Sequence, residues 1–141
     1  MAGSIDGAPS ACTDAGLGVV AGGEGLGPEQ LGDVAGAVRA LVGDYERMGD
    51  ANFRWAASER LEILADLLDE ARRSHQEWIV AMFGDRLPTT PAARRRAVHA
   101  LHVATDVYSW KLLRRDLHLS RTETEKTLAA LVAGVLEGTT R

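Results

Sequence analysis

Three polar side chains fall on helical faces that are otherwise apolar, and these have the most potential for specific chemistry: Asn52, His75 and Thr105. A buried polar group is costly unless it is hydrogen-bonded, so each needs a partner within the chain or a bound molecule. His75 lies one helical turn from Trp78. A histidine there serves either as a satisfied core residue or as the polar group of a pocket, and both interpretations stay open.

The distribution of aromatic residues favours the pocket. The three Trp, two Tyr and two Phe all lie between Tyr45 and Trp110, and the rest of the chain has none. Aromatic side chains with a few polar groups between helices are typical of sites for small apolar or amphipathic ligands. We therefore predict a ligand site formed by Tyr45, Asn52, Trp55, His75, Trp78, Met82, Thr105 and Tyr108. The competing interpretation is an interaction module with a filled core and no ligand.

Motifs for other chemistry are weak or missing. His99 and His102 are spaced to meet one metal ion, but no further ligands accompany them, so no metal is expected. The stretch "GLGVVA" at 16–21 formally matches a dinucleotide fingerprint, yet no strand pattern precedes it, and no cofactor is expected. There is no Glu-x-x-His, H-E-x-x-H or nucleophile-elbow pattern. An enzyme would have to depend on His75 alone, and we do not expect one.

Composition indicates one domain. The chain has 141 residues, 45% of them hydrophobic, and its formal net charge of −4 argues against a generic nucleic-acid binder. Cys12 is the only cysteine, so no internal disulfide is possible. We see no signal peptide and no apolar run of about 18 residues, and therefore expect a cytoplasmic protein without membrane contact. Residues 1–27 are Gly-rich and expected to be disordered, whereas residues 28–141 form the domain.

Hydrophobic periodicity predicts four helices and no strands, over residues 33–57, 58–83, 90–117 and 120–138. Gly49 predicts a kink or a split in the first helix. Thr90 with Pro91 predicts the start of the third, and Ser120 with Glu123 forms a capping box at the start of the fourth.

The last two predicted helices are apolar on two faces. In the third, one stripe contains Val98, Leu101, Thr105, Tyr108 and Leu112, and the opposite stripe contains Val103, Val107, Trp110 and Leu117. A surface helix of a monomer needs only one such stripe, so the second predicts cover by another molecule. The fourth helix repeats this with a bulky and a small-residue face, and the simplest solution is a four-helix bundle across a twofold axis. The predicted homodimer interface, anchored by Trp110, is Val103, Val107, Trp110, Leu117, Leu128, Ala130, Leu131, Ala133, Gly134 and Val135.

Three cations near the end of the third helix, Lys111, Arg114 and Arg115, could contact phosphates. No aromatic or Gly-rich phosphate site accompanies them, so we favour a solvated rim. A membrane-surface helix would need one continuous apolar face, which two opposed stripes do not supply.

Three blocks of sequence resemble a known family: "GDYERMGDANFRWAA" (43–57), "LLDEARRSHQEWI" (67–79) and "ATDVYSWKLLRRDLHLSRTETE" (104–125). Together they are similar to the C-terminal domain of TetR-family transcriptional regulators, over roughly residues 33–136. The Arg72, His75, Trp78 spacing adds to the resemblance. Ala71 and His118 depart from it, because glycine is common at both positions.

The resemblance implies an all-α antiparallel bundle of about four to five helices that binds a small inducer and dimerises through its last two helices. It implies ligand contacts from Tyr45, Trp55, His75, Trp78, Thr105 and Tyr108, and dimer contacts from Trp110, Leu117, Leu128, Leu131 and Val135. The family's N-terminal helix-turn-helix domain has no counterpart here, so we expect no direct DNA binding. The expectation is a truncated regulator or a free-standing sensor, able to pair with itself or with full-length relatives.

Overall fold

The computed structural model describes residues 33–58 and 62–138, with side chains described from residue 65 onward in the second range. The helices are α2 (Val34–Ala56), α3 (Glu62–Phe83), α4 (Pro91–Thr105), α5 (Val107–Lys111) and α6 (Arg121–Gly138). A 3₁₀ turn, η2 (Gly84–Arg86), follows α3, and a π-helical turn, η3 (Leu112–Asp116), follows α5. No strand occurs in these ranges, so the predicted all-α fold is confirmed. The expectations for 1–27, with Cys12 and the 16–21 motif, lie outside the described residues.

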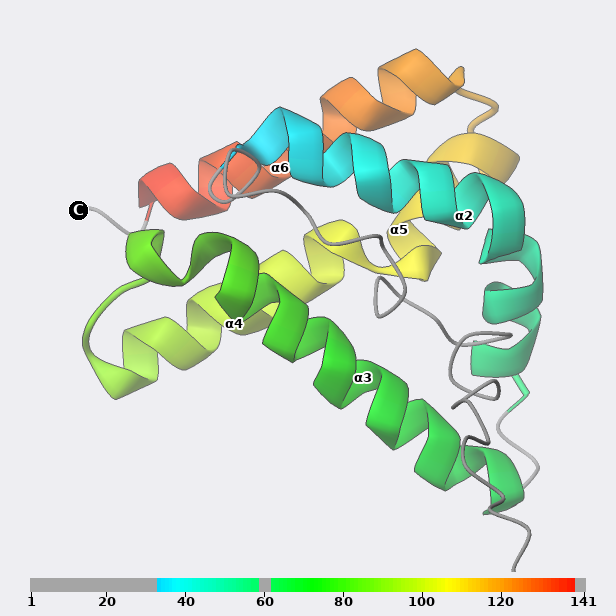
Figure 1. The fold of residues 1–141 in the computed structure, drawn as a ribbon. Helices are drawn as coiled ribbons and strands as arrows, with labels where there is room; N and C mark the ends of the chain where they lie inside the picture. Colours follow the sequence, from blue (N-terminus) through cyan, green and yellow to red (C-terminus); the bar gives the residue numbers. More distant parts are fainter. Residues whose placement is uncertain (1–32, 59–61, 139–141) are drawn as a thin grey trace, which may run out of the picture.

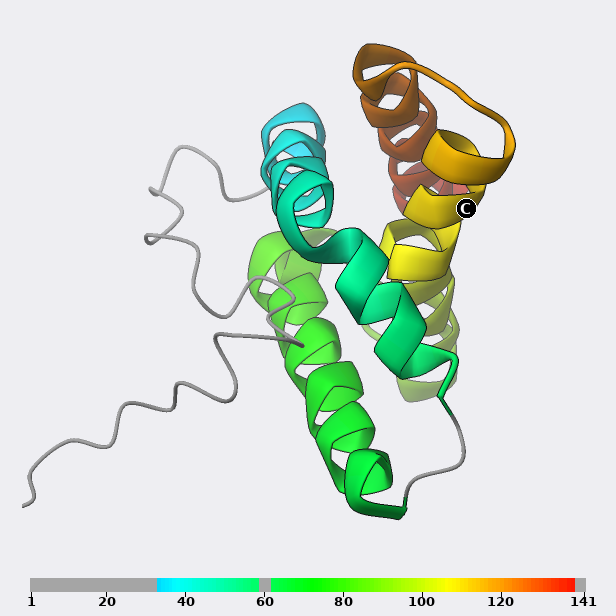
Figure 2. The same cartoon turned by 90° about the vertical axis from the view of Figure 1, so that its right-hand side faces the viewer.

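The helices pack in an order that differs from their order along the chain. α3 packs on α4, α4 on α6 and α6 on α2, while α5 lies against α2 (Figure 1). α4 and α6 run antiparallel, since the first turns of α4 and the last turns of α6 line one shared groove. α2 is one continuous helix that changes direction in its second half (Figure 2), which agrees with the kink predicted near Gly49.

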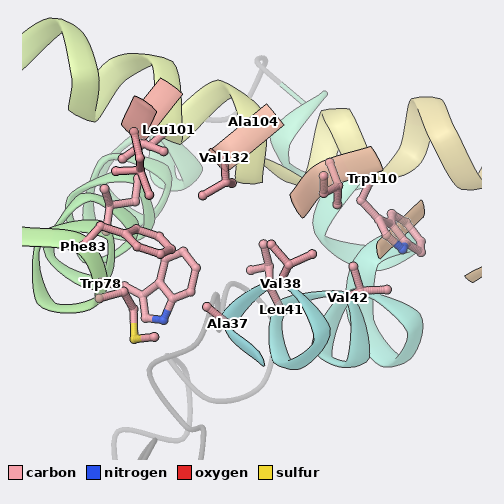
Figure 3. Packing of buried hydrophobic residues seen from close by; sticks show 14 of the residues in the cluster. Ala37, Val38, Leu41, Val42, Trp78, Phe83, Leu101, Ala104, Trp110 and Val132 are labelled. Atoms are coloured by element: carbon pink, nitrogen blue, oxygen red, sulfur yellow. The ribbon is translucent and has the colours of Figure 1, made fainter. Parts of the chain in front are cut away.

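The core collects large apolar side chains from every helix. Figure 3 shows Trp78 and Phe83 at one end of this cluster and Trp110 at the other, with Val38 and Leu41 of α2 between them. α6 contributes side chains spaced four residues apart, which is one face of a straight helix: Thr124, Leu128, Val132 and Leu136. Burial of each large apolar side chain stabilises the fold by roughly 1.5–3 kcal/mol.

The prediction of one continuous helix over residues 90–117 is wrong, because the helix is interrupted at Asp106. The backbone of Asp106 is extended (φ −74°, ψ 154°), and its side chain accepts a hydrogen bond from the backbone N–H of Tyr108 at 2.9 Å. An Asp that caps the following turn competes with helix continuation, which explains the break. The faces of α4 and α5 are therefore out of register. Tyr108, predicted on the core face with Thr105, is 47% exposed, and Leu112 is exposed as well.

Trp110 is enclosed by its own chain, so its prediction as the anchor of a dimer interface is wrong. Its side chain has 0% exposure. The ring packs over Gly49 of α2, lies 5.9 Å from the Tyr45 ring, and donates from Nε1 to Glu46 at 3.3 Å. Val107 and Leu128, also predicted at the interface, are buried in the same core. The Val107 and Trp110 part of the second apolar stripe is therefore covered within the chain, by α2, whereas Val103 and Leu117 of the same stripe are exposed.

The basic residues after α5 pair with acids of α2. Arg114 donates to both carboxylate oxygens of Glu46, with Nη2 to Oε2 at 3.0 Å, and these hydrogen bonds lower the pKa of Glu46. Arg115 forms a two-point pair with Asp50 at 2.9 and 3.0 Å. Such forked pairs orient both partners, so these arginines connect η3 to α2, with the Arg114–Glu46 pair half-buried and the Arg115–Asp50 pair exposed to solvent.

Two local predictions have different outcomes. The Ser120 hydroxyl accepts from the Glu123 N–H at 3.2 Å, so the Ser120 half of the predicted capping box is confirmed, whereas the Glu123 carboxylate pairs with Lys126 at 2.9 Å. Thr90 makes no side-chain cap hydrogen bond, although α4 does begin at Pro91. Between η3 and α6, His118 has φ 55°, a left-handed conformation that favours glycine. Glycine at position 118 would therefore remove the conformational strain of the backbone that His118 carries.

Replacing Gly49 by alanine is expected to destabilise the fold. The added Cβ would lie 2.5 Å from the Trp110 ring, which α2 and the core hold in place. Overpacking of this kind costs about 1–3 kcal/mol, measurable by urea unfolding. Gly43→Ala is the matched control on the same helix, because the nearest atom to its added Cβ is Arg121 Nη2 at 3.5 Å. That variant should gain about 0.5–1 kcal/mol, and equal effects at both positions would contradict the contact.

Candidate functional site

A small cavity lies where α2, α3 and the α4–α5 junction meet. Its volume is about 60 Å³. Its walls come from the end of α2, the middle of α3 and the break at Asp106: Asn52, Ala56, Leu68, Ala71, Arg72, His75, His102, Asp106, Val107 and Tyr108. This is enough space for a few water molecules. A site shaped for a drug-sized ligand would be several times larger, at about 300–1,000 Å³.

His75 is the centre of a buried hydrogen-bond network. Its Nε2 lies 2.7 Å from the Thr105 hydroxyl, which in turn donates to the Leu101 carbonyl at 2.7 Å. The backbone carbonyl of Thr105 accepts from the Tyr45 hydroxyl at 2.9 Å. The break after Thr105 leaves that carbonyl without a helical donor, which is why it needs a side-chain partner. The network therefore connects α2, α3 and the end of α4.

A second polar pair lies beside this network. The His102 Nε2 is 3.3 Å from Asp106 Oδ2, and the rings of His102 and His75 are 4.6 Å apart between centroids. Burial alone would raise the pKa of Asp106, but hydrogen bonds from His102 and from the Tyr108 backbone lower it overall. Asp106 is therefore ionised at neutral pH and adds negative charge to the cavity wall.

Burial lowers the pKa of His75 to about 4, with a further lowering from His102 and an opposing effect from Asp106. A charged imidazole would lose most of its hydration at this position, so the neutral ring is preferred. His75 therefore stays neutral at physiological pH and presents one donor and one acceptor nitrogen.

Two buried polar atoms near this region lack partners. Asn52 is only 4% exposed, yet its Oδ1 has no hydrogen-bond partner. Trp78 Nε1 is also buried and unpaired. Leaving a buried polar atom unsatisfied costs about 1–3 kcal/mol. Asn52 lines the cavity, so a bound molecule there has an acceptor to satisfy.

The predicted ligand residues divide into three groups. Asn52, His75 and Tyr108 line the cavity, and Tyr45 and Thr105 lie behind it in the His75 network. Trp78 contacts the His75 ring at 5.6 Å between centroids, but it lies in the core with Phe83 rather than on the cavity wall. Met82 is likewise a core residue, and Trp55 is 39% exposed; neither lines the cavity.

Sequence reasoning missed several wall residues. Ala56, Leu68, Ala71 and Val107 carried no signal beyond ordinary helical patterning. Arg72 belongs to the Arg72, His75, Trp78 spacing of the sequence resemblance, and the only sequence signal at His102 is its spacing from His99, which suggests a metal ligand. Asp106 could have been found by its type, since Asp favours the cap of a new helical turn.

The described residues form neither a metal site nor a membrane span. Among the described residues, no group of three or more His, Cys, Asp and Glu side chains is placed to hold a metal ion. His99, paired with His102 in the rejected metal interpretation, is exposed. Within the same ranges, every helix is too short or too polar to cross a bilayer.

Comparisons with protein-family models, with curated proteins and with solved structures each find no match to this chain. The fold and the site together define an all-α helical bundle with a small cavity between its helices, mostly apolar in its lining and carrying a few polar groups.

The neutral His75 predicts a pH-dependent stability. Between pH of about 6.5, the ordinary pKa of histidine, and about 4, the unfolded chain binds more protons than the folded one. Stability should therefore fall as the pH is lowered through this window, by about 3 kcal/mol in all. Urea unfolding across the window measures it. His75→Gln should flatten the slope, whereas His99→Gln, an exposed control, should retain it; an unchanged slope in His75→Gln would contradict the assignment.

Proposed function

We propose that this chain carries a small-molecule-sensing, dimerising regulatory domain of the TetR-like type, with its ligand site at the cavity beside His75. The observation that supports the proposal is the buried polar network around that cavity, with an unpaired acceptor on Asn52. Polar groups retained in an otherwise apolar core need a structural or functional reason. The resemblance of the 67–79 and 104–125 blocks to TetR-family C-terminal domains points to ligand sensing.

The position of the cavity offers a route from ligand to conformational change. A ligand whose buried part is larger than the present space would separate α3 from the α4–α5 junction, since their side chains form most of the walls. α5 carries Trp110, which rests on Gly49, and η3 leads directly into α6. A ligand that moves α5 therefore moves α6, provided that it binds the shifted arrangement more tightly.

The outer surface of α4 and α6 is the proposed dimer face. Val103 is 69% exposed and Leu131 is 49% exposed, and Ala130 and Gly134 of α6 are open to solvent. Small residues allow a second helix to approach closely. This face keeps the predicted pairing through α4 and α6 but excludes the residues that the core buries. Of the others predicted there, Leu117 is exposed, whereas Ala133 and Val135 are half-buried.

The size of the cavity favours a second candidate function. A volume of about 60 Å³ is what a nearly filled core would leave, which suits an interaction module that binds no small molecule. The same α4–α6 face would serve that module, so only ligand binding distinguishes the two functions.

Ligand screening with a cavity-filling variant tests the proposal. A library of small amphipathic compounds should yield members that raise the Tm of the full chain, with binding verified by calorimetry. Saturation at 100 times the Kd should add about 2.7 kcal/mol of stability. Ala71→Leu places a larger side chain at the cavity wall and should abolish binding.

Ala65→Leu is the matched control for that experiment, because Ala65 lies on α3 and is exposed. It should bind normally. Failure of every compound to bind the wild-type chain, or binding that Ala71→Leu leaves unchanged while circular dichroism shows a folded protein, would count against a ligand site here.

Charge on the α4–α6 face should break the dimer. Val103→Glu and Leu131→Glu place carboxylates on the proposed contact surface and should shift the chain to monomer in sedimentation equilibrium, because a buried unpaired charge is strongly unfavourable. Val80→Glu, on an exposed site of α3, should leave the association unchanged. A wild-type chain that sediments as a monomer at high micromolar concentration would refute the dimer.

A further inference from the structure

We propose that the cavity beside His75 takes the donor group of a small protonated amine, with a short apolar tail along the apolar part of its wall. The inference rests on the proposed function and adds the chemical class of the ligand. The inference depends on the hydrogen-bond acceptors at the cavity that the chain's own donors leave unused.

The first free acceptor is a nitrogen of His75. The Thr105 hydroxyl has one hydrogen, and it points to the Leu101 carbonyl at 2.7 Å. The His75 Nε2, 2.7 Å from the same hydroxyl oxygen, must therefore be the donor of that pair. In the neutral ring the other nitrogen, Nδ1, then carries a lone pair, which is the acceptor that His75 can offer to a bound molecule.

The second free acceptor is the side-chain oxygen of Asn52. Asn52 is only 4% exposed and lines the cavity, and its Oδ1 has no hydrogen-bond partner. Its unpaired oxygen and the Nδ1 of His75 come from different helices, α2 and α3. A ligand group that only accepts hydrogen bonds, such as a carboxylate or an ether, would leave both without a donor.

The charges around the cavity favour a cation. The Asp106 carboxylate lies on the wall; its Oδ1 accepts one hydrogen bond from Tyr108 and its Oδ2 faces His102, so each oxygen retains a lone pair. Arg72 is the only wall residue among those described that is always cationic. Its guanidinium bonds to Asp69 at 3.0 Å, and its side chain is 56% exposed, so its charge is offset at the surface.

Size and apolar lining narrow the class further. A volume of about 60 Å³ suits a compact ammonium group better than a guanidinium or an aromatic head. Three N–H donors on an ammonium match the acceptors of His75, Asn52 and Asp106. The rest of the wall includes Leu68 and Val107, which suit a short alkyl chain.

Four probes separate the contributions of charge and of donors. The full wild-type chain is titrated at neutral pH with n-butylammonium, n-butanol, n-butyltrimethylammonium and n-butyrate, by calorimetry and by amide NMR shifts. Butylammonium should bind at least tenfold more tightly than butanol, and the trimethyl analogue, which has the charge but no N–H donor, should bind at least tenfold more weakly than butylammonium. Butyrate should not bind.

Variants locate the binding. Asn52→Leu removes the acceptor and should weaken butylammonium binding at least tenfold, whereas Asn52→Asp adds a charged acceptor and should strengthen it. Ala65→Leu should bind as the wild type does. The two Asn52 variants have opposite expected effects, so a general loss of folding cannot imitate the result.

The outcomes also separate this inference from the proposed function. Tighter binding of butyrate, or equal binding of butylammonium and its trimethyl analogue, would overturn the amine assignment and leave a ligand site in place. The amine assignment would also be overturned, and the ligand site retained, if none of the four probes binds while library compounds bind the wild type and not Ala71→Leu. If no compound of any class binds at the cavity, both are wrong.

Discussion

The seating of Trp110 on Gly49 constrains the rest of this bundle. The large ring is fully buried only because α2 has no side chain at that position, and Glu46 accepts a hydrogen bond from its Nε1. The same carboxylate binds Arg114, and Arg115 stacks over the ring with its guanidinium carbon 4.7 Å from the centroid. One turn of α2 therefore fixes the position of α5 and η3, and through them the start of α6.

The break at Asp106 joins this contact to the cavity. Without it, the face that carries Leu101 and Thr105 would continue through Tyr108, and Trp110 would point to solvent. The extended residue rotates α5 so that Val107 and Trp110 enter the core. It also releases the Thr105 carbonyl to Tyr45 and places Asp106 on the cavity wall. The irregular segment is thus both a packing device and the polar part of the candidate site.

The balance of charge follows from the same geometry. Arg114 and Arg115 would form a basic patch on an isolated helix, yet each is bound to an acid of α2. A solvent-exposed ion pair typically stabilises a fold by about 0–1 kcal/mol. A forked pair at a half-buried position also fixes the relative orientation of its two partners. Polar groups around His75 are different, because their network is incomplete at Asn52. The incomplete part is where a ligand has something to gain.

The sequence by itself determined the all-α class, the limits of α2 and α6, the Ser120 cap and the polar character of Asn52, His75 and Thr105, because these follow from local periodicity and residue type. It could not show that α2 covers Trp110, nor that His102 and Asp106 join the site, since these depend on contacts between residues about 30–60 positions apart. Two apolar stripes look alike in sequence whether the cover is a partner or another helix of the same chain. Only the tertiary structure, through the rotation at Asp106 and the missing Cβ of Gly49, decided that α2 covers Val107 and Trp110.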